Sequence, residues 1–298
     1  MLEDHKVDIA LSRPRSLQLG RTPHEILLID ALDEAFAKLR QLAESGKTFR
    51  GTNQHGENQL LADFELEEST IQILRKANLP ARIISEEHGE VLISTSPQFT
   101  VHMDGLDGSG LYLKGGAESR FFHMIGIHND CDPSYADYSS AGFIDLVSGD
   151  IFIASAGKGA LLIKQNGVSL GLKIKESFAQ KTRVHADESI CANYGYDWNE
   201  LQRIGEPITI QCCAAKFADL LTGKVDLVLE GTRKGNLEQI IAYALICEAG
   251  GCVLDHKGQD IGTQKILNYG QKEKLPLIFG GEIRRTQIFM NNILQRHY

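Results

Sequence analysis

The chain has 298 residues, 42% of them hydrophobic and 23% charged, and a formal net charge of -8 at pH 7. That length is enough for a sizeable core in one large domain or in two closely joined halves, and the balance is ordinary for a globular protein. The acidic charge argues against a nucleic-acid polymer as partner, because a phosphate-backbone binder needs a basic face.

The cysteines and the apolar stretches indicate the cellular compartment of the protein. The six cysteines are irregularly spaced and form no CxxC pair. The N-terminal MLEDHKVDIALSRPRS is too polar for a signal peptide, and no apolar stretch approaches the ~18 residues of a membrane span. We therefore expect a cytoplasmic protein with free thiols and no membrane partner.

Two helices are expected near the N-terminus. The first spans residues 22–46, where Thr22 and Glu25 fit a capping box, Pro23 occupies the first helical position and an apolar stripe follows at helical spacing. The second spans residues 59–78 and is amphipathic in its lower half. Both are expected to pack as core helices.

Strands and helices follow in alternation. The expected strands cover residues 81–87, the start of 99–110 before its acidic turn, 121–128, 141–147, 150–156, two within 157–174, 183–189, the start of 208–223, 225–231, 252–260 and 275–281. The expected helices cover residues 196–205, the end of 208–223, 237–251 and 282–294.

This alternation predicts an α/β protein built in layers. We divide it into an N-terminal half, residues 1–165, and a C-terminal half, residues 166–298, with the seam between about residues 155 and 185. The N-terminal half carries most of the acidic motifs, and the C-terminal half is expected to complete the site.

The stretch DGLDGSG, residues 104–110, ends an apolar strand with two carboxylates in one short turn. Mg²⁺ binds oxygen ligands and usually takes only one or two carboxylates per ion, so Asp104 and Asp107 suit two neighbouring ions. A helix beginning at Gly108 and Ser109 would add an anion site beside them. Alone, the string is equally typical of an ordinary turn, and it lacks the spacing of a calcium-binding loop.

Further acidic residues stand at the ends of expected elements. Glu86 and Glu87 end a strand, Asp63 lies near the start of a helical segment, and Glu238 opens another helix. Each also has an ordinary interpretation, as a surface pair or as a charge favoured by the helix dipole. Together they indicate a cation site more strongly than any one of them does.

These motifs resemble those of the inositol monophosphatase and fructose-1,6-bisphosphatase superfamily of Mg²⁺-dependent phosphatases. The family's D-P-[IL]-D-G-[ST] is matched by residues 104–109 except at the proline, and its Glu-Glu strand end by Glu86 and Glu87. Asp63 has the family's spacing to Glu86, and Glu238 opens a helix that ends in EAGG. The resemblance covers roughly residues 57 to 290 and implies a layered α-β-α-β-α sugar-phosphatase fold with two mixed sheets.

The resemblance also implies roles for these residues. Two or three Mg²⁺ ions would be bound by Asp63, Glu86, Asp104, the Leu106 carbonyl, Asp107 and Glu238. Phosphate would be bound by Gly108, Ser109 and Gly110. A metal-activated water would attack, with Asp63, Glu86, Glu87 and Ser109 as catalytic residues. A homodimer or homotetramer is expected on the same ground.

The sequence departs from the family at several positions. Gly105 replaces the motif proline and is expected to loosen the turn, and Gly110 stands where the family has a side-chain donor. Lys216, Glu230 and Lys234 are candidate substrate contacts at the rim, or alternatively solvated surface charges. The substrate stays open among sugar bisphosphates, inositol phosphates and 3′-phosphonucleotides.

We expect an Mg²⁺-dependent phosphatase that hydrolyses a small phosphorylated sugar, inositol or nucleotide. One alternative is a catalytically weak relative that binds a metal or a phosphorylated ligand for regulation. Another is an unrelated α/β protein with coincidental acidic turns, in which the acidic side chains would lie far apart.

Overall fold

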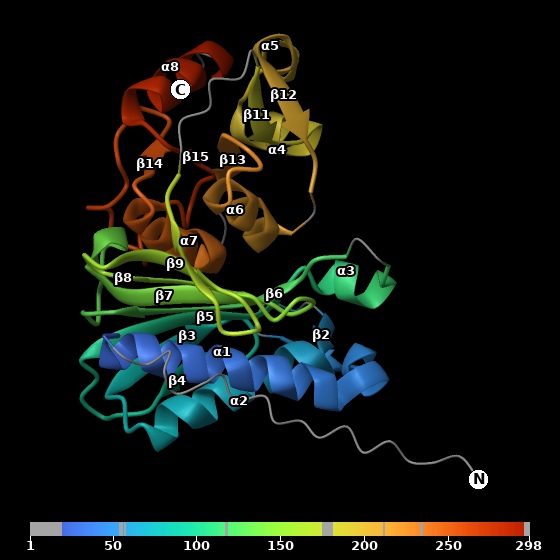
Figure 1. Cartoon of the computed structure of the whole chain (residues 1–298), viewed down its shortest axis with the longest axis vertical. Helices are drawn as coiled ribbons and strands as arrows, with labels where there is room; N and C mark the ends of the chain where they lie inside the picture. The colour runs from blue at the N-terminus through green and yellow to red at the C-terminus, as the bar shows by residue number, and fades with distance from the viewer. Residues whose placement is uncertain are drawn as a thin grey trace.

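The computed structural model describes residues 20–53, 56, 58–116, 119–174, 181–210, 212–232 and 235–294. These residues form layers in which helices and sheets alternate, from α1 and α2 at one end to α5 and α8 at the other (Figure 1). The predicted α/β class and the layered α-β-α-β-α arrangement are therefore confirmed.

The first layer contains α1 (Pro23–Leu42) and α2 (Leu61–Lys76). The α1 helix begins as predicted, with the Thr22 hydroxyl accepting a hydrogen bond from the Glu25 amide at 3.1 Å. Between the two helices lie the 3₁₀ turn η2 (Ala43–Lys47) and a hairpin of β1 (Phe49–Thr52) and β2 (Asn58–Leu60). The α2 helix starts later than predicted because the residues before it pair with β1.

The second layer is an eight-stranded mixed sheet in the order β10-β9-β8-β7-β6-β5-β3-β4. Only β3 and β5 pair in parallel, and the other pairs are antiparallel. Its strands are β3 (Ala81–Ser85), β4 (Gly89–Leu92), β5 (Phe99–Asp107), β6 (Phe122–His128), β7 (Tyr138–Asp145), β8 (Ile151–Ser155), β9 (Gly159–Ile163) and β10 (Ser169–Leu172). Short helical segments α3 (Ser109–Lys114) and η3 (Tyr135–Asp137) interrupt the run.

The third layer contains α6 (Cys213–Leu221) and α7 (Leu237–Glu248), and the fourth is a five-stranded mixed sheet in the order β12-β11-β13-β15-β14. Its strands are β11 (Thr182–His185), β12 (Gly205–Ile208), β13 (Leu227–Gly231), β14 (Cys252–Asp255) and β15 (Pro276–Gly280). The strand predicted at the start of 208–223 is wrong, because β12 ends at Ile208.

The outer helices α4 (Glu188–Tyr194), α5 (Trp198–Ile204) and α8 (Ile283–Ile293) cover the second sheet. One apolar core fills the space between α1, α2 and the first sheet, a second packs around α6 and α7, and a third lies beneath the outer helices. Each layer therefore buries an apolar face against the next.

The predicted division at residue 165 falls inside one hairpin. Asn166 and Gly167 lie in the turn between β9 and β10, which pair antiparallel in the first sheet. In addition, α7 packs from the C-terminal half onto strands of the first sheet. The two sheets are thus joined by shared packing, and the division into halves stays a prediction.

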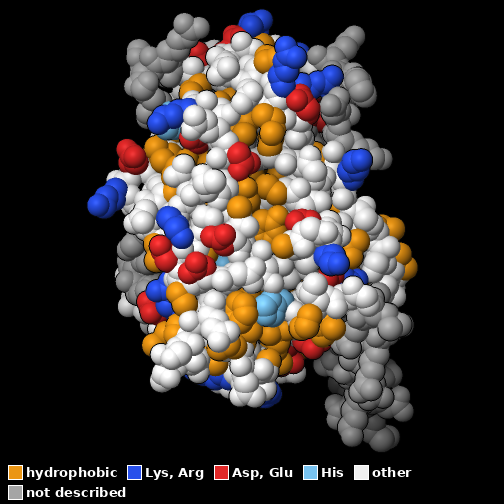
Figure 2. All heavy atoms as spheres, turned by 90° about the vertical axis from the view of Figure 1, so that its left-hand side faces the viewer, with side chains coloured by type: hydrophobic (Ala, Val, Ile, Leu, Met, Phe, Trp, Pro, Cys, Tyr) orange, Lys and Arg blue, Asp and Glu red, His pale blue; other side chains and the backbone are white. Residues whose placement is uncertain are grey.

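Among the described residues, no helix combines the length and apolar character that crossing a bilayer requires. On the face seen in Figure 2, acidic and basic side chains are interspersed among apolar ones. That face is not the basic surface that a phosphate-backbone binder presents.

Candidate active site

A cavity of about 180 Å³ opens where the first layer, the first sheet and α7 meet. Its walls come from the β1–β2 hairpin, α2, the residues after β3, the end of β5, the start of α3 and the start of α7. The lining residues are Asn53, Asn58, Leu60, Asp63, Glu86, Glu87, Asp104, Leu106, Asp107, Gly108, Ser109 and Glu238. The structure therefore brings the predicted acidic residues together, and the alternative of coincidental, separated acidic turns is wrong.

Three of the carboxylates form the tightest cluster. Oxygens of Asp104, Asp107 and Glu238 all lie within 4.8 Å of one another. Asp104 and Asp107 come from the end of β5, where the register with β6 shifts between them, and Glu238 lies in the first turn of α7. This spacing suits oxygen ligands arranged around a shared divalent cation.

The turn between Asp104 and Asp107 packs directly against α2. A Cβ at Gly105 would overlap the side-chain and backbone oxygens of Asp63 and would lie 3.0 Å from Glu67 Cγ. Gly105, which replaces the family's proline, is therefore required because α2 approaches this turn too closely for a Cβ atom. The Leu106 amide donates to Asp104 Oδ1 at 2.9 Å, which fixes that side chain over its own turn.

Within the described residues, two buried carboxylate oxygens in the cavity have no hydrogen-bond partner. These are Asp63 Oδ1 and Glu87 Oε2, on side chains that are 6% and 9% exposed. Such an oxygen is strongly destabilising unless a donor or a cation satisfies it. Because most of the polar side chains that line the cavity are carboxylates, the site fits a hard divalent cation such as Mg²⁺, which prefers oxygen ligands.

The pKa values of the cavity carboxyls reflect this lack of positive partners. Burial raises the pKa of Asp63 well above its ordinary value, and nearby negative charges add to the effect, in the order Glu67, Glu87, Glu86 and Asp107. Burial and the neighbouring carboxylates likewise raise the pKa of Asp104 well above its usual range. Burial also raises the pKa of Glu87. The cluster is repulsive by itself, and a cation would relieve that repulsion.

The α6 helix fixes the orientation of Asp107. Its carboxylate accepts hydrogen bonds from the amides of Cys213 at 3.3 Å and Ala214 at 2.5 Å, and the Cys212 thiol lies 3.1 Å from Oδ2. Sequence reasoning missed these contacts, because nothing in the Cys212-Cys213 pair indicates which distant carboxylate it meets.

The predicted phosphate-binding residues lie at the start of α3. Gly108 has φ 91° and ψ 27°, a left-handed conformation that favours glycine, and its carbonyl accepts hydrogen bonds from the Leu111 and Tyr112 amides. Ser109 begins the helix and lines the cavity. At Gly110 a Cβ would meet nothing within 4 Å, so that position does not require a glycine for space.

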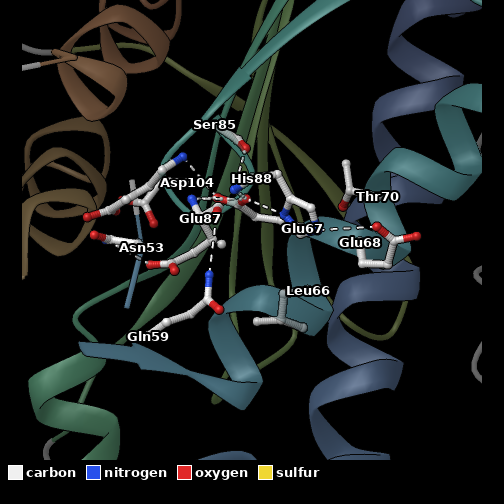
Figure 3. A network of polar contacts seen from close by, with 12 residues as sticks. Asn53, Gln59, Leu66, Glu67, Glu68, Thr70, Ser85, Glu87, His88 and Asp104 are labelled. Atoms are coloured by element: carbon white, nitrogen blue, oxygen red, sulfur yellow. Dashed lines mark hydrogen bonds and ion pairs between the residues drawn. The ribbon is translucent and has the colours of Figure 1, made fainter. Parts of the chain in front are cut away.

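The β1–β2 hairpin contributes residues that the sequence did not single out. Asn53 donates to Glu87 Oε1 at 3.4 Å, and Gln59 donates to the Glu87 carbonyl at 3.3 Å. Figure 3 shows both amide side chains directed toward Glu87. The hairpin therefore holds one wall of the cavity against the end of β3.

The predicted substrate contacts do not line this cavity in the described part of the chain. Lys216 on α6 and Glu230 on β13 form a buried ion pair, with Nζ and Oε1 2.5 Å apart. Their exposure of 5% and 0% shows that the alternative interpretation, solvated surface charges, is wrong. Lys234 lies outside the described residues. A substrate role for these side chains stays a prediction.

Comparison with known proteins identifies the fold. No family model and no curated protein matches the chain by sequence. A protein from Pyrococcus horikoshii with similarities to inositol-1 monophosphatase aligns over 91% of this chain and 98% of its own, with TM-score 0.69 and 20% identity. The Leishmania major fructose-1,6-bisphosphatase aligns over 94% and 99%, with TM-score 0.72 and 14% identity. Staphylococcus aureus inositol monophosphatase II aligns over 93% and 95%, with TM-score 0.70 and 15% identity. The chain therefore has the fold of the inositol monophosphatase and fructose-1,6-bisphosphatase superfamily.

Proposed function

We propose that this protein is a metal-dependent phosphatase that hydrolyses a phosphomonoester of a small sugar, inositol or nucleotide. The observation that carries the proposal is the cavity in which carboxylates from several elements meet beside the start of α3, with buried oxygens left unsatisfied. The shared fold supports it, since the structures it resembles are named as phosphatases of these classes.

The residues divide into two groups by what they would hold. Two or three Mg²⁺ ions would be bound by Asp63, Glu86, Asp104, the Leu106 carbonyl, Asp107 and Glu238. Mg²⁺ bound there would lower the pKa of water and offset charge on the phosphoryl group. The amides of Ser109 and Gly110, in the first turn of α3, have no intrahelical acceptor and would donate to the phosphate.

The remaining side chains would handle protons and orientation. Asp63, whose Oδ1 is buried and lacks a donor among the described residues, would accept a proton from the attacking water. The Ser109 hydroxyl, at the cavity wall, would orient that water, and Glu87 would assist as a second acceptor. Of the predicted substrate contacts, Lys234 stays a candidate, whereas Lys216 and Glu230 bury each other away from the cavity and would at most support its wall.

Phosphate release from a panel of substrates tests the proposal. The panel is fructose-1,6-bisphosphate, inositol-1-phosphate and a 3′-phosphonucleotide, each with Mg²⁺ and again with a chelator. We expect Mg²⁺-dependent release from at least one member. Mg²⁺ binding without release from any member would instead favour the alternative of a regulatory binding protein.

Assembly is a separate expectation. The fold leads us to propose a homodimer or homotetramer, and light scattering on the purified protein tests it. A monomer at all concentrations would contradict the expectation without affecting the proposed chemistry.

A further inference from the structure

Glu67 is a fully buried carboxylate next to the cavity, at 0% exposure. It lies on α2, one helical turn after Asp63, so both side chains share a face of the helix. Unlike Asp63 and Glu87, which keep an unsatisfied oxygen, it is surrounded by donors from a single stretch of chain, residues 86–88 (Figure 3).

Three consecutive backbone amides point at the Glu67 carboxylate. Oε1 accepts from the Glu86 amide at 3.1 Å and the Glu87 amide at 3.2 Å, and Oε2 accepts from the Glu87 amide at 3.2 Å and the His88 amide at 3.1 Å. Successive amides that converge on an anion form a concave nest, which fixes the backbone conformation of the segment. The direction of the Glu86 and Glu87 side chains depends on that conformation.

His88 completes the arrangement around Glu67. Its Nδ1 lies 2.9 Å from Glu67 Oε2, and its Nε2 lies 3.2 Å from the carboxylate of Glu68. The imidazole stacks on Phe64 with ring centroids 4.1 Å apart, and the Arg50 guanidinium lies 3.4 Å from the centroid of the same Phe64 ring. The ring is therefore held in place from several sides.

The face of α2 that carries Glu67 also contacts the acidic turn at residues 104–107, so it supports two acidic segments, residues 86–88 and residues 104–107. Thr70, one turn after Glu67, lies 2.9 Å from His123 Nε2, and His123 Nδ1 lies 3.1 Å from the Gly105 carbonyl. A carbonyl accepts only, so Nδ1 carries the proton and Nε2 accepts from the Thr70 hydroxyl. Asp63, Glu67 and Thr70 thus form one polar stripe that contacts both acidic segments.

We propose that Glu67 is a positioning residue, which together with His88 holds residues 86–88 so that Glu86 and Glu87 face the cation site. This inference rests on the proposed function, because it assigns Glu67 a role toward the same metal. Glu67 itself has its oxygens occupied by protein donors and does not line the cavity. Its effect is exerted through the backbone of its neighbours.

Calorimetric titration with Mg²⁺, independent of turnover, tests the proposal. Glu67→Gln replaces one acceptor oxygen by an NH₂ group that would face a backbone amide. The two donors repel, so the hydrogen bonds that hold residues 86–88 are weakened. We expect 10- to 100-fold weaker binding, the usual range when a supporting partner of a metal ligand is lost. The matched control is Glu65→Gln on the same helix, two residues before Glu67 and therefore on another face, where its carboxylate lies 3.9 Å from Lys38. It is expected to bind within about twofold of the parent.

His88 variants separate positioning from loss of charge. His88→Leu removes the imidazole donor and leaves every carboxylate in place, so we expect affinity to fall about threefold or more, the value of one hydrogen bond. His88→Asn, whose amide restores a donor, is expected to recover most of it. These variants also keep the proposal testable if Glu67→Gln does not fold.

The outcomes are distinct. Glu67→Gln with parental affinity and only a lower melting temperature would overturn the proposal, because a purely structural role predicts that result. If Glu67→Gln binds Mg²⁺ weakly while His88→Leu binds it like the parent, the effect comes from the lost charge of Glu67 and not from positioning. That outcome would also overturn the proposal. An unmutated protein that binds no Mg²⁺ would refute the proposed metal site itself.

Discussion

Two sets of buried carboxylates in this protein have opposite surroundings. Glu67 and Asp219 are saturated with donors: Asp219 on α6 contacts Arg120 Nη1 at 2.8 Å, His185 Nε2 at 3.1 Å and Lys224 Nζ at 3.2 Å. In the cavity, Asp63 and Glu87 each keep a buried oxygen without any donor. Glu67 and Asp219 thus serve the framework, whereas the cavity oxygens of Asp63 and Glu87 stay available to a cation or a proton.

The pKa of Asp219 and the pKa values of the cavity residues Asp63 and Asp104 shift in opposite directions. Burial alone would raise the pKa of Asp219, but the His185 hydrogen bond and the charges of Arg120 and Lys224 outweigh burial and lower it to about 2. Burial raises the pKa of Asp63 and Asp104 well above the ordinary range, and the like charges around them add to the effect. The framework carboxylate therefore stabilises the metal-free fold when ionised, whereas the cavity carboxylates destabilise it.

The largest effect is expected for Asp104→Asn. Asp104 belongs to the cluster of three carboxylates that would hold the cations, so kcat should fall by roughly 10²–10³-fold or more, the scale of losing one preorganised charge contact. The melting temperature of the metal-free protein should stay equal or rise, because one of several repelling carboxylates is neutralised. Steady-state kinetics and melting curves check both; a parental kcat, or a large loss of stability, would contradict the contrast between the two sets.

Asp219→Asn should give the opposite pattern. It removes the charge that pairs with Arg120 and His185, and we expect about 1.5–3 kcal/mol of destabilisation, the range for hydrogen bonds to charged groups. Mg²⁺ affinity at a temperature where the variant is folded should change little. Urea unfolding combined with calorimetry measures the two quantities, and unchanged stability would show that this network is not part of the framework.

The pH dependence of stability should differ between the two sets. Because the folded pKa values of Asp63 and Asp104 are raised, their stabilising contribution is present below about pH 4 and is lost as pH rises through those raised values. Asp219 behaves oppositely: its contribution is present above about pH 4 and is lost as pH falls toward about 2.

Melting curves from pH 4 to 8, with a chelator and with saturating Mg²⁺, measure this dependence. With a chelator, we expect a fall in melting temperature toward neutral pH that is shallower in Asp104→Asn, and Mg²⁺ should restore stability at neutral pH. Equal slopes in parent and variant would refute the assignment of that fall to the cavity.

The smallest effect is expected for Glu238→Asp. The shorter side chain withdraws one carboxylate from the cluster with Asp104 and Asp107, so Mg²⁺ affinity should weaken roughly tenfold, the lower end for a perturbed metal site. The fold should not change, since the start of α7 keeps an acidic residue. Mg²⁺ titrations of activity and binding test this, and an unaltered Mg²⁺ dependence would exclude Glu238 as a ligand.

Much of the site could be predicted from sequence. Asp104 and Asp107 carry their own local signal, two carboxylates and several glycines at a strand end. Asp63, Glu86 and Glu238 were placed by their resemblance to family motifs, and all of them line the same cavity. Regular elements such as α1 were predicted because capping and helical periodicity are local properties.

What could not be predicted depends on contacts between distant segments. Glu67 lies at helical spacing from Asp63, but a glutamate in a helix is ordinary, and only the folded chain shows which amides it meets. The sequence predicts Lys216 and Glu230 as substrate contacts at the rim because it does not reveal that they bury each other. Gly105 was expected to loosen its turn, and only the position of α2 shows that the glycine permits tight packing.

The position of α7 has a consequence for folding. This helix brings Glu238 from the second half of the chain onto the first sheet, most of whose strands precede residue 165. Asp104 and Asp107 lie there at the end of β5. A nascent chain that has emerged only as far as the first sheet would present an incomplete ligand set. Cation capture by all three carboxylates would then report that both halves have docked, and divalent ions would select the fully assembled protein over its folding intermediates.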